Sequence, residues 1–136
     1  MKSKSTTHTY TVLGNPIGLF KVNDETSTPG IWNDYKQARC IYVISLEKQH
    51  DDLPLFYGAI KVEAKFFMQL SSYKNNAPTL KDPHIKAPAL LNLFNFINNA
   101  CVGTIYKKAC IITAIEITKQ YDKNPRTEIT ITTREK

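Results

Sequence analysis

Residues 58–68, GAIKVEAKFFM, alternate between apolar and charged side chains over most of their length. The apolar set consists of Ile60, Val62, Ala64, Phe66 and Met68, and the charged set of Lys61, Glu63 and Lys65. A repeat of two residues is the period of a β-strand with one buried and one solvated face. This segment therefore predicts a sheet that is covered on one side only.

Two segments have the spacing of helices that could cover such a sheet. Residues 33–49 begin at Asn33, a residue type favoured at the N-cap, and place apolar side chains at helical intervals. The second predicted helix starts at Pro88, whose missing N–H is tolerated in a first turn, and is terminated by Gly103. Its apolar stripe consists of Leu90, Phe94, Ile97 and Cys101.

Three further segments predict strands. Residues 8–14 alternate, and residues 109–118 and 126–132 are β-branched runs joined by a polar connection, which predicts an antiparallel hairpin. The expected order is β-α-β-α-β-β, an α/β (α+β) fold with a mixed sheet and helices packed on it. With 136 residues the chain is expected to form a single domain over 1–136, with a flexible lead-in at 1–7 and a long loop at 69–87.

The chain carries 18 Lys and Arg against 12 Asp and Glu, a formal net charge of +6 that favours an anionic partner such as nucleic acid. The chain has three cysteines, Cys40, Cys101 and Cys110, which is an odd number without C-x-x-C spacing. Each lies in an apolar run, so we expect buried free thiols and a reducing, cytoplasmic location. No apolar run approaches the roughly 20 residues of a membrane span, so no membrane partner is expected.

The polar side of the second predicted helix carries Asn92, Asn95 and Asn99 at i, i+3 and i+7. A solvated face is the simplest interpretation. Asparagine is nevertheless a poor helix former, and Glu, Lys or Gln would serve a solvent-facing stripe better. The alternative is that these residues belong to an inherited functional surface.

Residues 84–112, with GNPIG at 14–18, Trp32 and YDKNPRTEITI at 121–131, resemble the RusA-type Holliday junction resolvases, which are crossover junction endodeoxyribonucleases. The family pattern is approximately Lys-Pro-Asp-x-Asp-Asn-Leu, a helix, a glycine, Asp-Asp and an apolar strand. The resemblance implies a RusA-like fold and a homodimer that cuts four-way DNA junctions. It also implies Mg²⁺ or Mn²⁺ held by the aspartates, because phosphodiester hydrolysis by such ions needs carboxylate ligands.

Carried onto this chain, the family pattern keeps Pro88, Asn92 and Leu93. Its four aspartates fall on Ala89, Leu91, Lys108 and Ala109, and a family lysine falls on Asn95. The resemblance thus places the catalytic positions at Ala89, Leu91, Asn95 and Ala109, without carboxylates. No metal and no cofactor are expected for the chain as written, and Mg²⁺ or Mn²⁺ would be expected if the family site were intact.

Residues expected to contact DNA flank these positions, and they are Lys74, His84, Lys86, Asn92, Lys107 and Lys108. The first functional hypothesis is a branched-DNA-binding protein whose cleavage is lost or strongly reduced. The alternative is an active resolvase whose acids were removed by engineering, or whose site is misaligned and uses Asp82, Glu116 or Asp122. A third is a protein-interaction module that has lost DNA binding and keeps only the homodimer. A homodimer is expected because the resembled family is dimeric and because Tyr42, Phe66 and Phe67 are expected to need cover.

Overall fold

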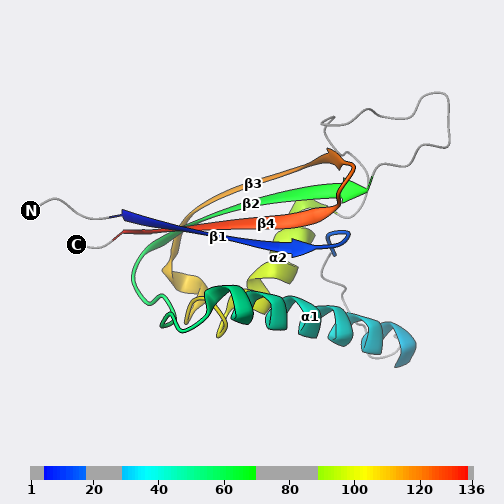
Figure 1. Ribbon diagram of the computed structural model, residues 1–136, viewed down its shortest axis with the longest axis horizontal. Coiled ribbons are helices and arrows are strands. Elements are labelled where there is room, and N and C mark those ends of the chain that lie inside the picture. Colours follow the sequence, from blue (N-terminus) through cyan, green and yellow to red (C-terminus); the bar gives the residue numbers. More distant parts are fainter. Residues whose placement is uncertain (1–4, 18–28, 70–88, 135–136) are drawn as a thin grey trace, which may run out of the picture.

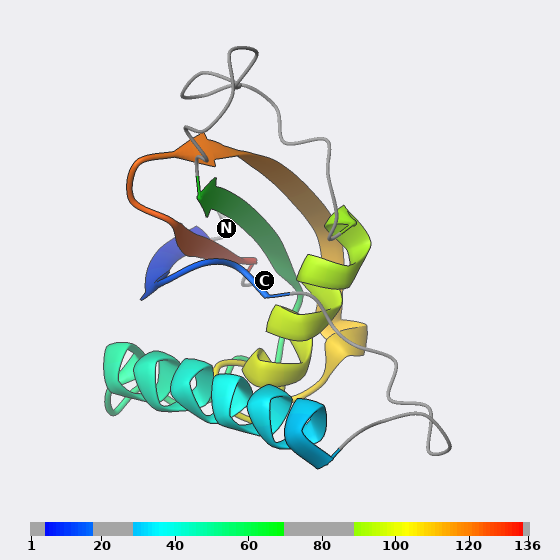
Figure 2. The ribbon, with the colours of Figure 1, turned by 90° about the vertical axis from the view of Figure 1, so that its right-hand side faces the viewer.

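In the part of the protein that the computed structural model describes, four strands form one mixed sheet and two helices lie on the same face of it (Figures 1 and 2). The structure describes residues 5–17, 29–69 and 89–134. The elements are β1 (Ser5–Leu13), α1 (Pro29–His50), β2 (Ile60–Gln69), α2 (Leu90–Cys101), the short 3₁₀ helix η1 (Ala109–Ile111), β3 (Ile112–Asp122) and β4 (Arg126–Arg134). The predicted α+β class and element order are therefore confirmed.

The strand order in the sheet is β1-β4-β2-β3, so the predicted hairpin of the last two strands is wrong. β2 lies between them, parallel to β3 and antiparallel to β4. Composition identified both runs as strands but could not identify their partners. The β2–β4 register places Lys65 opposite Glu128 and Phe67 opposite Arg126, two cross-strand pairs that favour this neighbour.

The apolar face of β2 is buried as its alternation predicts, with Ile60, Val62, Ala64, Phe66 and Met68 all at most 5% exposed. Phe67 is an exception to the alternation, because it points to the opposite face and is still buried. The guanidinium of Arg126 lies 3.8 Å from the centre of its ring. A cation over an aromatic ring is favourable, and the alkyl part of the arginine excludes water.

α1 begins at Pro29, earlier than the predicted Asn33, because proline fits the first turn of a helix as well as a loop. The helix ends at His50, and Asp51 follows with φ 55° while its N–H bonds to the carbonyl of Glu47 at 2.9 Å. A residue in the left-handed region is a common helix terminator, and aspartate tolerates it better than most.

The three aromatic side chains that are expected from the sequence to need cover by a partner are covered within the chain itself. Tyr42 is 3% exposed, donates or accepts a hydrogen bond with Thr127 Oγ1 at 3.0 Å, and meets Phe96 edge to face. Phe66 is 1% exposed, and Phe67 lies under the Arg126 guanidinium. These residues therefore give no argument for a homodimer.

The cysteine prediction is correct only for Cys101, which is buried at the end of α2. Cys40 on α1 and Cys110 in η1 are exposed. An apolar neighbourhood in the sequence does not show which side of a helix a residue faces, and both lie on outward faces. Burial raises the pKa of the Cys101 thiol to about 12, so this group remains protonated.

The other boundaries move by a few residues. β1 starts at Ser5 and ends at Leu13, so residues 5–7, which were expected in the lead-in, pair with β4. β3 starts at Ile112 because residues 109–111 form η1, and it continues to Asp122. Most of the predicted loop at 69–87 lies outside the described residues. Neither helix, where described, is long and apolar enough to cross a membrane.

A buried polar contact joins β1 to the end of α1. His50 is 2% exposed and Tyr10 is also 2% exposed, and the Tyr10 hydroxyl lies 2.6 Å from His50 Nδ1. The other ring nitrogen, Nε2, lies 3.1 Å from the carbonyl of Pro54. A neutral ring that donates from Nε2 and accepts at Nδ1 satisfies both partners.

Replacing Tyr10 with phenylalanine should lower the free energy of unfolding by about 1–3 kcal/mol, because it leaves a buried ring nitrogen without its partner. Thr9→Val changes an exposed hydroxyl on the same strand and should have little effect. Urea denaturation of the two variants and the parent protein measures the difference. Equal stability of Tyr10→Phe and the parent would show that the Tyr10–His50 hydrogen bond makes no net contribution to the free energy of unfolding.

Candidate nucleic-acid interface around helix α2

The first turn of α2 contains two of the positions assigned to family aspartates. Ala89 is the N-cap and has no side-chain hydrogen bond to the helix, and the turn contains no acidic residue. Leu91 is 68% exposed. The first N–H groups of a helix lack intrahelical partners and carry partial positive charge. Without acids, this helix end attracts anions and offers no ligand to a cation.

The other two positions follow the turn after α2. Gly103 turns the chain with φ 83°, Lys108 is the N-cap of η1, and Ala109 is its first residue. Lys107, Lys108 and Ala109 are all exposed. Neither lysine takes part in a salt bridge among the described residues. Two positive charges are therefore presented to solvent beside a strand that packs against α2.

Tyr106 fixes the position of these lysines. It is buried, and its hydroxyl donates to Asn98 Oδ1 at 2.5 Å. Burial raises the pKa of Tyr106, so it stays protonated and remains a donor. On either side, Phe56 N–H bonds to the carbonyl of Ile105 at 2.9 Å and Lys107 N–H to the carbonyl of Phe56 at 3.0 Å. The backbone that carries Lys107 is thus held from two sides.

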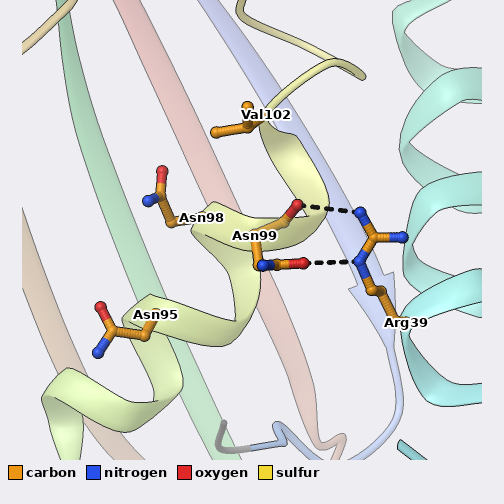
Figure 3. A pocket seen from close by; sticks show the side chains of 5 residues that line it. All are labelled: Arg39, Asn95, Asn98, Asn99 and Val102. Carbon is orange, nitrogen blue, oxygen red and sulfur yellow. Dashed lines mark hydrogen bonds between the residues drawn. The ribbon is translucent and has the colours of Figure 1, made fainter. Parts of the chain in front are cut away.

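The asparagine face of α2 borders a recess toward α1 (Figure 3). Its volume is about 460 Å³, and it is lined by Arg39, Asn95, Asn98, Asn99 and Val102. The prediction that Asn92, Asn95 and Asn99 face away from the apolar stripe is confirmed, since all three are exposed. Asn98, which the sequence argument did not single out, is half-buried and joins the recess to Tyr106.

Arg39 forms one wall of this recess. Its Nε donates to Asn99 Oδ1 at 2.6 Å and its Nη2 donates to the Asn99 carbonyl at 3.3 Å. The carbonyl is near the C-terminal end of α2, where a cation also opposes the helix dipole. No carboxylate of the described residues pairs with Arg39. No local sequence signal marked this residue, because its partner comes from another helix.

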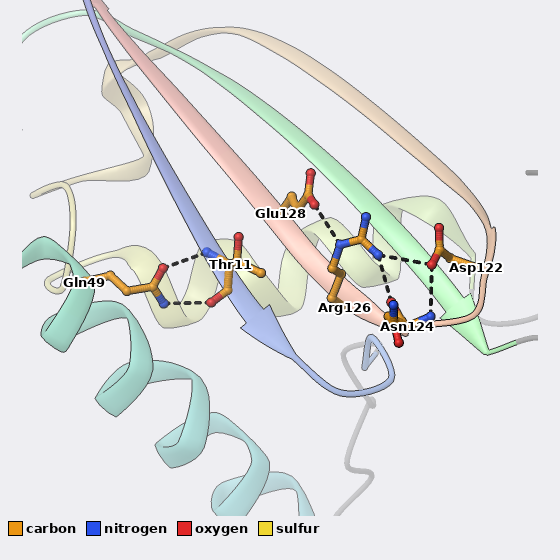
Figure 4. Close-up of polar contacts among 6 residues, drawn as sticks. All are labelled: Thr11, Gln49, Asp122, Asn124, Arg126 and Glu128. Carbon is orange, nitrogen blue, oxygen red and sulfur yellow. Dashed lines mark hydrogen bonds and ion pairs between the residues drawn. The ribbon is translucent and has the colours of Figure 1, made fainter.

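The acids considered as substitute metal ligands are engaged elsewhere or undescribed. Glu116 lies 3.4 Å from Lys61 Nζ, and Asp122 lies 3.2 Å from Arg126 Nη1 (Figure 4). Their positions in the strands place them on the face of the sheet away from the helices. No cluster of three His, Cys, Asp or Glu residues occurs in the described part of the chain. Asp82, Lys74, His84 and Lys86 lie outside the described residues.

α2, the turn at Gly103 and β3 follow one another in the order expected for a RusA-type resolvase. A comparison with protein families tests whether the chain belongs to that family. The family model of endodeoxyribonuclease RusA matches residues 19–132, which is most of the chain. The protein belongs to the RusA family. No curated protein matches it significantly. Within this RusA-family fold, the surface around α2 combines exposed lysines, an uncapped helix N-terminus and an amide-lined recess.

Replacing Arg39 with methionine should remove both bonds to Asn99 and lower the free energy of unfolding by about 1 kcal/mol. Arg39→Lys keeps the charge but not the forked geometry, so it should lose a similar amount. Lys48→Met, an exposed change near the end of the same helix, serves as the control. Thermal unfolding and amide exchange in α2 measure the effect. Full stability in Arg39→Lys would show that charge alone is required.

Proposed function

We propose that this RusA-family protein binds branched DNA, with four-way junctions as the preferred structure, and that it does not cut it. The observation that carries the proposal is the chemistry around α2. Lys107 and Lys108, which follow the turn after α2, are exposed, and the first turn of α2 contains no acidic residue. Phosphate contacts require positive charge and N–H donors, whereas hydrolysis by a metal ion requires carboxylates.

The distribution of ion pairs supports the placement of DNA on this side of the molecule. On the uncovered face of the sheet, Lys61 pairs with Glu63 and Glu116, and Arg126 pairs with Asp122 and Glu128. These bridges pair Lys61 and Arg126 with more acids than bases on that face, although Lys65 there forms no salt bridge with a described residue. Arg39, Lys107 and Lys108 around α2 form no salt bridge with a described acid, so their positive charges are available to phosphate.

The change at Lys108 does more than remove a ligand. A lysine at a former metal position supplies the positive charge that the metal would otherwise supply to a phosphate oxygen. Its ammonium group is only a hydrogen-bond donor and cannot lower the pKa of a bound water to generate a hydroxide nucleophile, as a metal ion held there would. Binding without hydrolysis is the chemical result. The proposed species is a homodimer, as the family resemblance suggests, so that two such surfaces meet one junction.

If Lys107 and Lys108 each neutralise one phosphate, Lys107→Ala or Lys108→Ala should reduce the slope of log affinity against log salt by about one unit. Affinity for a labelled four-way junction and for linear duplex is measured by fluorescence anisotropy across a salt series. Lys123→Ala, an exposed change at the opposite end of β3, is the control. Unchanged slopes for both variants, with the parent still binding, would place the DNA elsewhere.

Cleavage by the unmodified protein should remain at background with Mg²⁺ or Mn²⁺. Restoring the acids together, as Ala89→Asp, Leu91→Asp, Lys108→Asp and Ala109→Asp, should create Mn²⁺ binding and metal-dependent junction cleavage. Single replacements should do little, because ligands hold a hydrated cation as a set. All four positions are exposed, so the fold should tolerate the changes.

The matched control carries asparagine in place of each introduced aspartate, which keeps the side-chain shape and removes the charge. Metal binding is followed by titration calorimetry and by the electron paramagnetic resonance of Mn²⁺, independently of cleavage. Metal-dependent cleavage by the unmodified protein would overturn the proposal and favour the alternative, an active resolvase with acids not identified here.

A further inference from the structure

The recess beside α2 is lined mainly by groups that can still donate hydrogen bonds. It lies between α2 and Arg39 of α1, and its other lining residues are Asn95, Asn98, Asn99 and Val102 (Figure 3). Its volume of about 460 Å³ falls within the range of roughly 300–1,000 Å³ that is typical of small-molecule sites. The polar groups that remain unpaired in its walls determine which ligand it can accept.

Two of the three asparagines have their amide oxygens occupied. Asn98 Oδ1 accepts from the Tyr106 hydroxyl at 2.5 Å. Asn99 Oδ1 accepts from Arg39 Nε at 2.6 Å. A carboxamide whose oxygen is held in this way has a fixed orientation, and its NH₂ group is the end that remains free. Neither NH₂ group has a hydrogen-bond partner among the described residues. Both amides therefore offer donors to the recess.

Arg39 adds a further donor. Its Nε and Nη2 both bond to Asn99, whereas its Nη1 makes no hydrogen bond with a described residue. A guanidinium group only donates, while the amide of Asn95 can donate or accept. The recess thus has three donors of fixed direction and one adaptable amide. Its complementary ligand carries hydrogen-bond acceptors.

The end of α2 at which the recess lies favours a neutral acceptor over a phosphate. Asn98 and Asn99 belong to the last turn of the helix, and Val102 is its C-cap. The last C=O groups of a helix lack intrahelical partners and carry partial negative charge. Arg39 donates to one of these groups, the Asn99 carbonyl, so its charge is already offset at short range. An anion would meet the remaining carbonyl groups unfavourably.

Tyr106 connects the recess to the exposed lysines. Its hydroxyl holds Asn98, and the next residue in the chain is Lys107. A DNA strand whose phosphates contact Lys107 and Lys108 would bring its bases close to the recess. The neutral acceptors of DNA are on these bases, and they include the carbonyl oxygens of thymine, cytosine and guanine. Adenine has no carbonyl group.

Only a base that has left the double helix can reach these donors. α1 packs against α2 beside the recess (Figure 2). Two adjacent helices, each about 10–12 Å in diameter, are wider than a major groove of about 12 Å. This face of α2 therefore cannot enter a major groove to contact paired bases. At a branch point a base is less costly to unpair, because its stacking is already interrupted.

We propose that the recess between α2 and Arg39 holds an unpaired nucleobase of the bound DNA, whose carbonyl oxygens accept hydrogen bonds from Asn98, Asn99 and Arg39. Val102, which is half-buried, supplies an apolar contact to the ring. The inference rests on the proposed function, the binding of branched DNA around α2, and adds that this surface contacts a base as well as the backbone. Thymine, which has two carbonyl groups, is a better ligand than adenine.

The first test compares three four-way junctions that differ in one extra nucleotide at the branch point. This nucleotide is thymidine, deoxyadenosine or an abasic sugar, so the number of phosphates is the same in all three. By fluorescence anisotropy, the parent protein should bind the thymidine junction roughly three- to tenfold more tightly than the abasic one, as expected for one or two hydrogen bonds. The deoxyadenosine junction should resemble the abasic one. Equal affinity for all three junctions, or for thymidine and deoxyadenosine, would overturn the proposal.

The second test removes the donors and keeps the contacts that hold them. Asn99→Asp retains the oxygen that Arg39 binds, Asn98→Asp retains the oxygen that Tyr106 binds, and each replaces an NH₂ donor with an acceptor. Both variants should lose the preference for thymidine over the abasic sugar. Gln37→Glu, an exposed change on α1 that alters the charge equally, should keep it. A preference that survives in both asparagine variants, with folding confirmed by thermal unfolding, would place the base elsewhere.

Nucleosides test the recess separately from the binding of DNA, because they carry no phosphate. In ¹H–¹⁵N spectra of the parent protein, millimolar thymidine should shift the side-chain amide signals of Asn98 and Asn99, and deoxyadenosine should not. If these signals shift but no junction is bound, the proposed function fails and the base site stands. If junctions are bound with no preference and no signal shifts, the base site fails and the proposed function stands.

Discussion

The antiparallel ladder between β2 and β4 holds the two halves of the sheet together. Among the described strands, β1 is bonded to β4 and to no other, and β3 is bonded to β2 and to no other. Across this ladder Ala64 lies opposite Ile129 and Val62 opposite Ile131, and none of the four is more than 1% exposed. Their side chains form the floor on which α1 and α2 pack. The turn that presents the lysines is placed by this packing, because it is fixed to α2 through Tyr106.

The elements with strong periodicity could be predicted from the sequence, and the contacts between them could not. The alternation of β2 and the apolar stripe of α2 each describe a single segment, and a single segment determines its own burial pattern. The partner of β4 depended on cross-strand pairs such as Phe67 with Arg126, which lie far apart in the chain. The role of Arg39 was also missed, because its partner Asn99 lies in another helix, far away in the sequence. The first turn of α1 was missed because Pro29 fits both a loop and a helix start.

For the candidate site, too, the sequence argument located single segments but not the contacts between them. Its position at the start of α2 and after Gly103 followed from the family resemblance and stays a prediction, while the family itself is shown by the match over residues 19–132. Ala89, Leu91, Lys108 and Ala109 are all exposed, so none of them is required for packing. The fold therefore places no constraint on whether these positions carry acids. Sequence change there alters the chemistry of the surface without disturbing the packing of the core, since the core beneath is formed by other residues.

The pairing of β1 with β4 also governs the order in which the molecule can assemble. Its register joins residues 5–13 to residues 126–134, so that among the described strands the first in sequence pairs with the last and with no other. During synthesis, β1 and the apolar face of β2 must wait until β4 has left the ribosome. Contacts this distant in sequence are slow to form because they close long loops. The apolar face of β2 therefore has α1 and α2 as its earlier-synthesised neighbours in the core, before β4 is available.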